Sequence, residues 1–412
     1  MTVFYLLGIY IYYLLLAIAS WFNPKARFWI RGRKGLFKKL KQEITPDEKI
    51  VWFHCASLGE FEQGRPLIEA FKEKYKQYKI LLTFFSPSGY EIRKNYEGAD
   101  YIYYLPLDTP KNAKRFLNIV DPSVVFFIKY EFWYSFIKEI GKREIPLYLV
   151  SGIFRKNQRF FKKQAFKSQK MLGDFTHFFV QNEESANLLN GISINNVSIT
   201  GDTRFDRVYT IAKNSKNLPL IEKFKGNNHL LIAGSTWKLD EDLITRYINE
   251  TESKLKFIIA PHEIHSENID RIVKSINTDI EILKYSDANS ENISNAQVLI
   301  INNIGLLSSL YKYGDIAYVG GGFGKGIHNT LEAATFGMPL LFGPNYMKFK
   351  EAVDVINAGG AFSISEYDEL KRKIEFYLSR PNDIIKAGQI TSNYVRNKQG
   401  ATEKILKLIS LK

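Results

Sequence analysis

Short apolar runs alternate with helical patterns through nearly the whole chain, and this alternation restricts the fold more than any other feature. The runs show little polar alternation, which is typical of parallel strands that helices cover on both faces. In the first half the predicted strands are Ile50–Cys55, Ile80–Phe85, Tyr101–Leu105, Val124–Ile128, Leu147–Val150, His177–Val180 and Val197–Thr200. In the second half they are His229–Ala233, Phe257–Ala260, Ile280–Leu283, Val298–Ile301, Ile316–Val319 and Pro339–Phe342. We therefore predict an α/β protein with two doubly wound, Rossmann-like domains that face each other across a cleft.

A polar, lysine-rich stretch over residues 213–228 separates the two series of strands and is predicted to be a linker. The two domains are then residues 23–212 and 229–382. The final segment, 383–412, is expected to pack back toward the first domain. Ligands of such folds bind at the carboxyl ends of the strands, so residues that follow a strand are the first candidates for a site.

The N-terminal segment differs from the rest of the chain. Val3–Phe22 contains no charged residue and is long enough to cross a bilayer as a helix. Asn23–Lys41, which follows it, is rich in Lys and Arg and contains no Asp or Glu, so the remainder is expected in the cytoplasm. We therefore predict a membrane-anchor helix over residues 1–22, with membrane lipid as its partner. A buried core helix fits these flanks poorly.

The composition excludes several classes of protein. A hydrophobic content of 45% and a charged content of 24% are those of a globular protein, not a disordered one. Cys55 is the single cysteine, which excludes an internal disulfide and fits a reducing compartment. The formal net charge of +14 requires an anionic partner or surface. The sequence contains no recognition-helix, zinc-finger or RNA-binding motif, so we predict no nucleic-acid partner.

A glycine-rich segment, Gly320–Pro344, indicates a nucleotide site in the second domain. It follows a predicted strand and opens into a predicted helix, Asn329–Phe336. In this arrangement backbone N–H groups and a helix N-terminus face an anion, and glycines let the backbone approach it. Glu332, in the first turn of the helix, could accept hydrogen bonds from two vicinal ribose hydroxyls. The segment therefore predicts a nucleotide or nucleotide-sugar site.

Two glutamates follow predicted strands of the first domain. Glu60 comes after Ile50–Cys55 at the start of a helix, and Glu131 comes after Val124–Ile128. A carboxylate at a helix start is often explained by the helix dipole alone. Two carboxylates over one crevice, however, could supply a general base and a partner that orients it or tunes its pKa.

The segment Arg155–Lys170 is basic, contains no acidic residue and is interleaved with phenylalanines. One interpretation is a solvated basic helix. The other is a site for an anionic amphiphile, whose phosphate groups would contact the cations while its acyl chains contacted the phenylalanines. The candidate acceptor contacts are Arg155, Lys156, Arg159 and Phe160.

Metal chemistry is not expected. The run Asp240-Glu241-Asp242 is similar to the metal-binding Asp-x-Asp pattern of some sugar transferases, but it lies inside a helical pattern. We therefore predict a solvated helix start there. No group of His, Cys and carboxylate side chains has the spacing of a metal site, so we predict no metal.

Several segments taken together point to one family. They are His54-Cys55-Ala56-Ser57-Leu58-Gly59-Glu60, Glu131-Phe132-Trp133, Gly201-Asp202-Thr203-Arg204-Phe205-Asp206, Gly234-Ser235-Thr236, Gly320-Gly321-Gly322, His328-Asn329-Thr330-Leu331-Glu332 and Phe342-Gly343-Pro344. With these segments the chain resembles the 3-deoxy-D-manno-octulosonic acid (Kdo) transferases of lipopolysaccharide biosynthesis, along essentially its whole length.

The resemblance implies a GT-B fold and a metal-independent, inverting transfer of Kdo from CMP-Kdo to a lipid A precursor (lipid IVA), without a cofactor. It implies Glu60 as the general base and Glu131 as a second carboxylate on the acceptor side. The residues implied for the donor are Arg204, Ser235, Pro261, His262, Gly320, Gly321, Gly322, Asn329, Thr330, Leu331 and Glu332. It also places the catalytic domains on the cytoplasmic face of the inner (plasma) membrane.

Two positions depart from the family pattern. The family usually has Pro-Arg-His where this chain has Pro261-His262-Glu263, so a fixed positive charge is replaced by a titratable one. Gly322 stands where the family has a serine, which removes a hydroxyl donor.

The implied reaction is an in-line displacement. A lipid hydroxyl deprotonated by Glu60 attacks the anomeric carbon of Kdo, and CMP leaves as a phosphate anion that Lys325, Arg204 or His262 could stabilise. Alternative functions are an N-acetylglucosaminyltransferase of cell-wall synthesis, a UDP-sugar epimerase and a non-enzymatic lipid-binding scaffold. Nothing in the sequence favours one oligomeric state over another.

Overall fold

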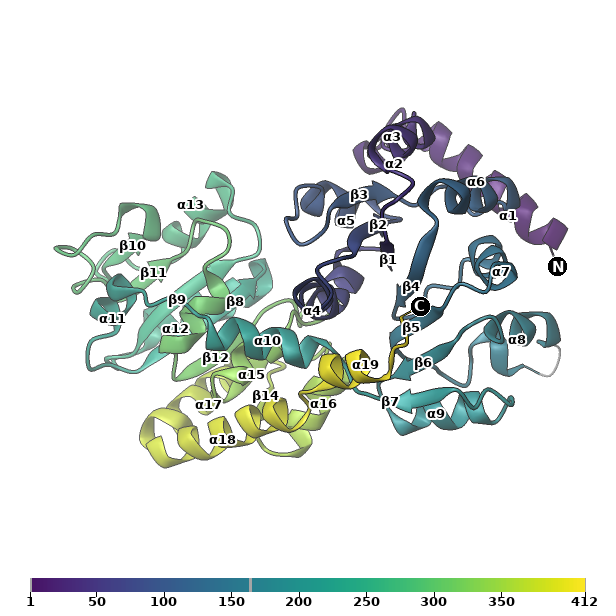
Figure 1. The fold of residues 1–412 in the computed structure, drawn as a ribbon. Helices are drawn as coiled ribbons and strands as arrows, with labels where there is room; N and C mark the ends of the chain where they lie inside the picture. Colours follow the sequence, from purple (N-terminus) through teal and green to yellow (C-terminus); the bar gives the residue numbers. More distant parts are fainter. Residues whose placement is uncertain (1, 163–164, 412) are drawn as a thin grey trace. The chain divides into compact units, whose positions relative to one another are not determined.

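The computed structural model describes residues 2–162 and 165–411 and contains two compact units (Figure 1). Unit 1 comprises the chain up to Arg207 together with the segment from Gln399 onward, and unit 2 comprises Val208–Lys398. The chain returns to unit 1 only at Gln399. The final segment that the sequence set apart from Asp383 is therefore divided between the two units.

Unit 1 is built on a parallel, seven-stranded sheet in the order β3-β2-β1-β4-β5-β6-β7. Its strands are β1 (Ile50–Cys55), β2 (Lys79–Phe84), β3 (Tyr101–Tyr104), β4 (Pro122–Ile128), β5 (Leu147–Gly152), β6 (His177–Val180) and β7 (Val197–Ile199). Its helices are α1 (Thr2–Ala19), α2 (Pro24–Arg31), α3 (Leu36–Glu43), α4 (Leu58–Lys74), α5 (Pro87–Arg93), α6 (Pro110–Val120), α7 (Tyr134–Lys142), η1 (Arg159–Phe161), α8 (Phe166–Leu172), α9 (Glu183–Asn190) and α19 (Ala401–Leu408). The helix α10 (Arg204–Lys213) crosses the boundary between the units.

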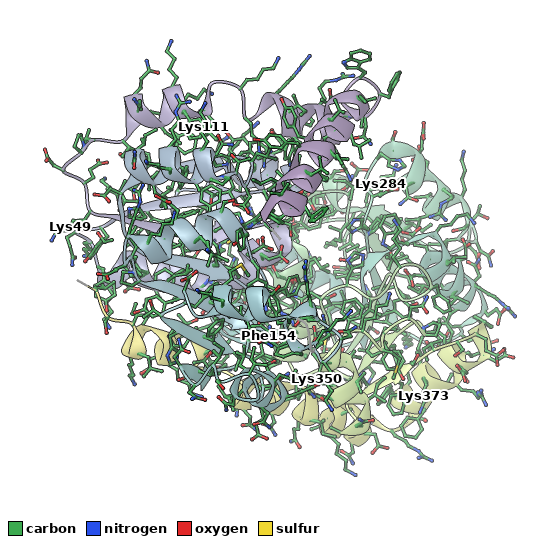
Figure 2. All side chains as sticks on the ribbon, turned by 90° about the vertical axis from the view of Figure 1, so that its right-hand side faces the viewer. Lys49, Lys111, Phe154, Lys284, Lys350 and Lys373 are labelled. Atoms are coloured by element: carbon green, nitrogen blue, oxygen red, sulfur yellow. The ribbon has the colours of Figure 1, made fainter. Side chains whose placement is uncertain are left out.

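Apolar side chains cover both faces of the unit 1 sheet. Neighbouring residues of β1 point to opposite faces, so Trp52 belongs to one apolar cluster and Phe53 to another. Phe154, labelled in Figure 2, is 2% exposed in the first cluster. Because both faces are buried, the strands read as continuous apolar runs, and this is why the sequence predicted them.

Unit 2 repeats the scheme with a second parallel, seven-stranded sheet in the order β10-β11-β9-β8-β12-β13-β14. Its strands are β8 (Leu230–Thr236), β9 (Lys256–Pro261), β10 (Ile282–Lys284), β11 (Val298–Ile300), β12 (Ile316–Val319), β13 (Leu340–Phe342) and β14 (Ala361–Ser363). Its helices are α11 (Pro219–Lys225), α12 (Lys238–Glu250), α13 (Ser266–Lys274), η2 (Tyr285–Asp287), α14 (Leu307–Leu310), η3 (Tyr311–Tyr313), α15 (Thr330–Thr335), α16 (Lys350–Asn357), α17 (Tyr367–Ser379) and α18 (Pro381–Asn397). The prediction of two doubly wound parallel sheets is confirmed.

Two parts of unit 2 differ from the prediction. The edge strand β14 was missed because only three residues pair, with no apolar run to mark them. The segment predicted to be a linker contains the helix α11, whose Ile221 and Phe224 are fully buried. Leu218, just before α11, donates its backbone N–H to the hydroxyl oxygen of Tyr313 at 2.6 Å. Residues 213–228 are therefore in part an ordered piece of unit 2.

The N-terminal helix α1 packs against unit 1. The ring of Tyr12 lies with its centroid 5.9 Å from that of Trp29 and 6.2 Å from that of Phe85. Many large apolar side chains of α1 remain exposed, namely Val3, Phe4, Leu7, Tyr10, Ile11, Leu14, Leu15 and Ile18. Among the residues that the structure describes, no helix combines the length and apolar character that crossing a bilayer requires. The predicted membrane-anchor helix over residues 1–22 is therefore not supported as a spanning segment.

Candidate functional site

The two predicted catalytic carboxylates lie at the carboxyl edge of the unit 1 sheet. Glu60 is in the first turn of α4, directly after β1, and is 9% exposed. Ser57, at the N-cap position of α4, donates its hydroxyl to the Glu60 carboxylate instead of capping the helix backbone. Glu131 lies in the loop between β4 and α7 and is 8% exposed. Both side chains are thus held nearly out of solvent.

The two carboxylates follow paired strands, Glu60 after β1 and Glu131 after β4, so both lie at the same edge of the sheet. Cys55, the last residue of β1, is fully buried, and burial is the main cause that raises the pKa of its thiol. The charges of Glu60 and then Glu131 raise the thiol pKa further. Both carboxylates therefore contribute to the electrostatic environment of the thiol at the end of β1.

A buried histidine lies next to Glu131. His54 is fully buried, and its Nε2 lies 3.5 Å from a Glu131 carboxylate oxygen. The same Nε2 accepts the indole N–H of Trp133 at 2.8 Å. An indole N–H can only donate, so Nε2 carries no proton and the proton is on Nδ1. Nδ1 then donates to the Thr83 hydroxyl oxygen at 2.9 Å. The sequence analysis included His54 and Trp133 in the family segments but assigned no role to either residue.

The loop that carries Glu131 begins in an unusual backbone conformation. Lys129 has φ 73°, in the left-handed backbone region that residues other than glycine rarely adopt. Its N–H donates to the carbonyl of Val150 in the neighbouring strand β5 at 2.7 Å. Such backbone conformations persist only where the surrounding structure enforces them, and they concentrate at functional sites.

The basic segment of unit 1 is not one helix. Of the predicted run Arg155–Lys170, residues 163–164 lie outside the described residues, and the rest forms a loop, η1 and part of α8. The predicted acceptor contacts Arg155, Lys156 and Arg159 are exposed, and none of these three cations forms an ion pair within residues 2–162 and 165–411. Phe160 is half-buried, with its ring centroid 4.7 Å from that of Phe132.

An apolar cavity lies beside this segment. Its volume is about 290 Å³, at the lower limit of small-molecule sites. The lining residues are Phe4, Tyr5, Phe132, Tyr134, Arg159, Phe160, Ser168 and Met171. One wall comes from α1, one from the loop after Glu131 and one from the basic segment. The cavity therefore offers apolar walls with a guanidinium at its rim.

Arg204, which the resemblance assigned to the donor, belongs to unit 1. Its guanidinium pairs with the buried carboxylate of Asp202 at 2.8 Å. Asp202 also accepts the side-chain amide of Gln63, on α4, at 3.0 Å. Arg204 thus lies beside the helix that begins near Glu60.

In unit 2 the predicted donor residues gather at the carboxyl ends of the neighbouring strands β9, β8 and β12. Ser235, near the end of β8, has φ 54°, and Gly320 follows β12. A Cβ at Gly320 would lie 2.4 Å from the carbonyl oxygen of Ser235, and one at Gly322 would lie 2.5 Å from the backbone nitrogen of Gly343. These glycines are therefore required for close backbone packing within unit 2. Gly321, with φ 93°, makes the turn between them.

The residues after the glycine loop divide into two groups. Thr330 and Leu331 have buried side chains, so only their backbone could contact a ligand. Asn329 is exposed; its side-chain oxygen accepts the N–H of Leu331 at 3.2 Å, and its amide donates to Glu332 at 3.0 Å. Asn329 and Glu332 are therefore the side chains of this segment that can contact a donor.

Three rings form a stack at the same edge. Pro261 ends β9, and the ring of His262, next in the chain, lies 4.6 Å from both Trp237 and His328. The Trp237 indole N–H donates to Nε2 of His328 at 2.9 Å. Burial, and secondarily the neighbouring His262, lowers the pKa of His328 to about 4. His328 is therefore neutral near pH 7, as an acceptor of the indole N–H must be. Trp237 was expected at the end of a strand, but no role was predicted for it.

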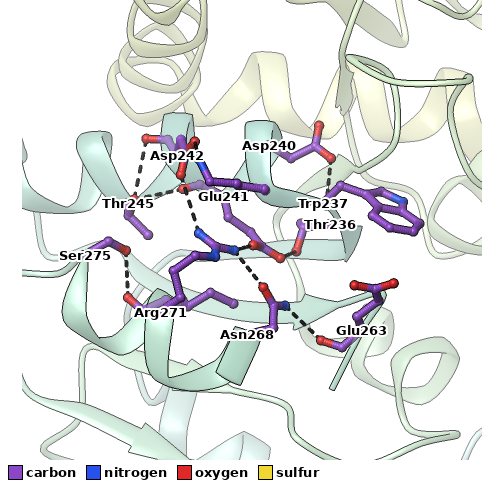
Figure 3. Close-up of polar contacts among 12 residues, drawn as sticks. Thr236, Trp237, Asp240, Glu241, Asp242, Thr245, Glu263, Asn268, Arg271 and Ser275 are labelled. Carbon is purple, nitrogen blue, oxygen red and sulfur yellow. Dashed lines mark hydrogen bonds and ion pairs between the residues drawn. The ribbon is translucent and has the colours of Figure 1, made fainter. Parts of the chain in front are cut away.

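The acidic run at the start of α12 is not solvated, so that prediction is wrong. Asp240 is 1% exposed and Glu241 is fully buried, while Asp242 alone is exposed. The Glu241 carboxylate accepts the Thr236 hydroxyl at 3.0 Å and pairs with Arg271 (Figure 3). Helix α12 packs the side that carries Asp240 and Glu241 onto the sheet. Their carboxylates are therefore hydrogen-bonded by donors of the protein instead of by water. The sequence did contain one signal for this site, namely a carboxylate three residues after a strand-to-helix loop.

The described residues contain no group of three or more His, Cys, Asp or Glu side chains arranged to hold a metal ion.

Comparison with known proteins shows similarity to one family of transferases. Residues 30–207 match the family described as 3-deoxy-D-manno-octulosonic-acid transferase (kdotransferase). Among similar proteins, the 3-deoxy-D-manno-octulosonic acid transferase of Haemophilus influenzae is 25% identical over 403 residues, covering 94% of this chain and 92% of the relative. That of Aquifex aeolicus is 27% identical over 350 residues, covering 84% of this chain and 90% of the relative.

Solved structures show the fold alone, because their sequence identity is low. UDP-GlcNAc 2-epimerase from Neisseria meningitidis has a TM-score of 0.60 at 16% identity, covering 87% of this chain and 99% of that one. MurG from Acinetobacter baumannii has a TM-score of 0.55 at 11% identity, covering 88% and 98%. The fold is thus of the GT-B type, which transferases and epimerases share. Residues 30–207 match the Kdo transferase family, and the two transferases named above are similar to most of the chain, so the protein is similar to the Kdo transferases and these relatives indicate a glycosyltransferase.

Proposed function

We propose that this protein transfers Kdo from CMP-Kdo to a lipid A precursor, lipid IVA, with inversion at the anomeric carbon and without a metal ion. The observation that carries the proposal is that Glu60 and Glu131, both nearly buried, follow the paired strands β1 and β4 within the part of the chain that matches the family. Two carboxylates that are shielded from solvent at the same edge of the sheet are suited to abstract a proton from an acceptor hydroxyl.

Glu60 acts as the general base in this mechanism. The acceptor O–H bond breaks as its proton passes to the Glu60 carboxylate, and the oxygen attacks the anomeric carbon of Kdo from the side opposite CMP. The bond between that carbon and the CMP oxygen breaks, and CMP leaves with the electron pair as a phosphate monoester. The Ser57 hydroxyl orients Glu60, and Glu131 holds the acceptor on the same edge.

The donor nucleotide binds at the carboxyl edge of unit 2. Support comes from the grouping of Ser235, His262 and the glycine loop at the ends of adjacent strands. Glu332, bound by Asn329, accepts from the ribose hydroxyls, and an exposed His262 on the ring stack meets the phosphate. The buried Thr330 and Leu331 contribute through the backbone.

The acceptor is a membrane amphiphile, so the protein works at the cytoplasmic face of the inner membrane. Support comes from the exposed apolar side chains of α1, which would lie in the bilayer interface without spanning it. The cations Arg155, Lys156 and Arg159 meet lipid phosphates, and the cavity beside Phe160 takes part of an acyl chain.

The test is transfer by purified full-length protein in detergent, with CMP-Kdo and a Kdo-free lipid A precursor. We expect a product heavier by the Kdo unit in mass spectrometry and free CMP in equal amount. Nuclear magnetic resonance of the product should show an anomeric configuration inverted relative to CMP-Kdo. Retained configuration would contradict the mechanism, and transfer of N-acetylglucosamine from UDP-N-acetylglucosamine instead of Kdo would contradict the substrate.

A further inference from the structure

We propose that the N-terminal helix α1 is a positioning element of the active site, which holds the loop Lys129–Trp133 and with it Glu131. We call these residues the Glu131 loop. This inference rests on the proposed role of Glu131 at the acceptor side. Two independent contacts carry it, one through Tyr5 and one through Tyr12, and both lie inside unit 1.

The first contact fixes the helix that follows the Glu131 loop. The Tyr5 hydroxyl donates to the carboxylate of Asp108, which is fully buried. The same carboxylate accepts the backbone N–H groups of Ser135 at 3.0 Å and Phe136 at 3.1 Å, in the first turn of α7. The ring of Tyr5 also lies 5.7 Å from that of Tyr134, the first residue of α7. Tyr5 is therefore connected to the exact point where the loop ends and α7 begins.

Ionisation does not weaken this contact near neutral pH. Burial, followed by the charge of Asp108, raises the pKa of Tyr5, so the phenol keeps its proton and donates. Burial also raises the pKa of Asp108, although the Tyr5 hydroxyl and the backbone N–H groups of Ser135 and Phe136 oppose the shift. A hydroxyl donor and two backbone N–H donors from α7 thus meet on one buried acceptor.

The second contact reaches the loop itself through aromatic rings. Tyr12 packs against Phe85 and Trp29, whose own ring centroids lie 5.5 Å apart. Phe85 lies 4.5 Å from Trp133, the last residue of the Glu131 loop. Trp133 then donates its indole N–H to His54, whose Nε2 lies 3.5 Å from Glu131. The rings thus connect α1 to Trp133 and His54, and His54 lies next to the Glu131 carboxylate.

Arg33 keeps the middle of this ring series in place. It donates to the backbone carbonyls of Phe85 and Leu105, each at 2.8 Å, and its guanidinium lies 3.7 Å from the centre of the Trp29 ring. Burial lowers the pKa of Arg33 to about 9, so it remains charged near pH 7. Trp29 and Phe85 are therefore a fixed support on which Tyr12 packs.

Both contacts act at the C-terminal end of the Glu131 loop, one on Trp133 and one on the first turn of α7. Lys129, at the other end of the loop, is in a left-handed conformation. The face of α1 that does not contact unit 1 exposes apolar side chains. One helix therefore carries both the lipid-facing surface and the support of a catalytic loop. If α1 only attached the protein to lipid, the contacts of Tyr5 and Tyr12 with unit 1 would not affect the rate of transfer.

The test uses full-length variants of Tyr5 and of Tyr12, whose ring packs on Phe85 and Trp29 although it is 41% exposed, and leaves the other exposed apolar side chains of α1 intact. Tyr5→Phe removes only the hydroxyl, and Tyr12→Leu removes the ring that packs on Phe85. Matched controls are Tyr13→Phe and Tyr10→Leu; Tyr10 is 57% exposed on the same helix. Transfer is measured with a detergent-dispersed acceptor, so that vesicle binding does not limit the rate.

We expect kcat to fall by roughly 10-fold to 100-fold in Tyr5→Phe and Tyr12→Leu, the size of effect that a small displacement of catalytic groups produces. The KM for CMP-Kdo should stay within about 2-fold, because the donor residues lie in unit 2, and both controls should keep the wild-type kcat. A lowered melting temperature with an unchanged kcat would show a merely structural role and would overturn the proposal.

A double-variant cycle tests the route. Trp133→Phe keeps the ring but removes the N–H that binds His54, so it should lower kcat by itself. If Tyr12 acts through Trp133, the double variant Tyr12→Leu/Trp133→Phe should lose no more than the larger single loss. Losses that multiply would contradict the ring route. Absence of Kdo transfer by the wild type would contradict the proposed function, whereas wild-type transfer with unaffected variants would contradict only the role of α1.

Discussion

One carboxylate oxygen of Asp240 accepts the backbone N–H of Gly321 at 2.8 Å and also the backbone N–H of Trp237 at 2.9 Å. The other oxygen accepts the hydroxyl of Tyr318 at 2.8 Å. A single buried side chain thus joins the end of β8 to the first turn of the glycine loop after β12. Burial raises the pKa of Asp240, while the two backbone N–H donors and the Tyr318 hydroxyl lower it. We infer that Asp240 keeps the donor side of unit 2 in its binding conformation.

Asp240→Ala should weaken the binding of CMP and lower the stability of unit 2. Removing a buried, charge-assisted acceptor leaves two backbone N–H groups without a partner, at a cost of roughly 1.5–3 kcal/mol. Tyr318→Phe is the matched control, because it leaves both N–H bonds intact and should have a smaller effect. Urea unfolding and isothermal titration with CMP measure the two quantities. Equal effects of the two substitutions would show that the N–H contacts do not order the loop.

Asn329→Ala and Glu332→Ala should weaken CMP and spare the acceptor. Their side chains are bonded to each other and are the parts of the segment after the glycine loop that can reach a ligand. Each loss should be about 10-fold in affinity, as for one or two hydrogen bonds. Asn357→Ala, an exposed amide at the end of α16, is the control. If both variants bound CMP with the wild-type affinity, the nucleotide would have to bind elsewhere than at this helix.

The fold was largely predictable from the sequence, and the reason is visible in β1. All six of its residues are buried, so it reads as a continuous apolar run. The same logic failed for β14, where only three residues pair next to Gly359 and Gly360. It also failed for α11, whose two buried apolar residues are surrounded by lysines. A short element supported by tertiary contacts leaves too little local pattern to be found.

The site was predictable only in part. Glu60 and Glu131 could be proposed because each follows a strand, and the structure shows that these strands, β1 and β4, are paired. Asp240 was taken for a solvated residue because its burial depends on where α12 lies on the sheet, which the local sequence does not encode. Likewise, nothing near Tyr5 in the sequence indicates its contact with Asp108. Contacts between side chains from distant segments of the sequence cannot be predicted from local motifs.

Glu60→Gln should lower kcat by roughly 10²–10⁴, the contribution of a general base. The amide has nearly the same shape but cannot take the acceptor proton, so CMP affinity and melting temperature should change little. Glu62→Gln, on the same helix and paired with Arg93 at 2.8 Å, is the control and should keep most of the activity. Near wild-type turnover by Glu60→Gln, with the same pH profile, would remove Glu60 from the role of base.

His328 should make the folded protein lose stability on mild acidification. Its folded-state pKa of about 4 is below the value of about 6.5 expected in the unfolded chain, so the unfolded state binds more protons between these values. The stabilisation is therefore fully present above pH 6.5 and is lost as the pH falls toward 4. His328→Gln retains an acceptor for Trp237 but cannot titrate. Urea unfolding at pH 7 and pH 5 should show a larger loss for the wild type than for the variant, and parallel losses would contradict the assignment.

The exposed apolar face of α1 should carry most of the binding to lipid. Leu15 and Ile18 are 59% and 52% exposed on this helix, and burying such a side chain contributes roughly 1.5–3 kcal/mol. Leu15→Glu/Ile18→Glu should therefore lower flotation with anionic vesicles by more than about 10-fold, whereas Ile385→Glu, equally exposed on α18, should not. The wild type should stay bound in molar salt, because apolar burial is not screened. Binding that remains in the double variant should disappear in salt, since it depends on the cations of Asn23–Lys41 and of Arg155, Lys156 and Arg159. Salt-resistant binding by the double variant would mean that an apolar surface other than α1 enters the membrane.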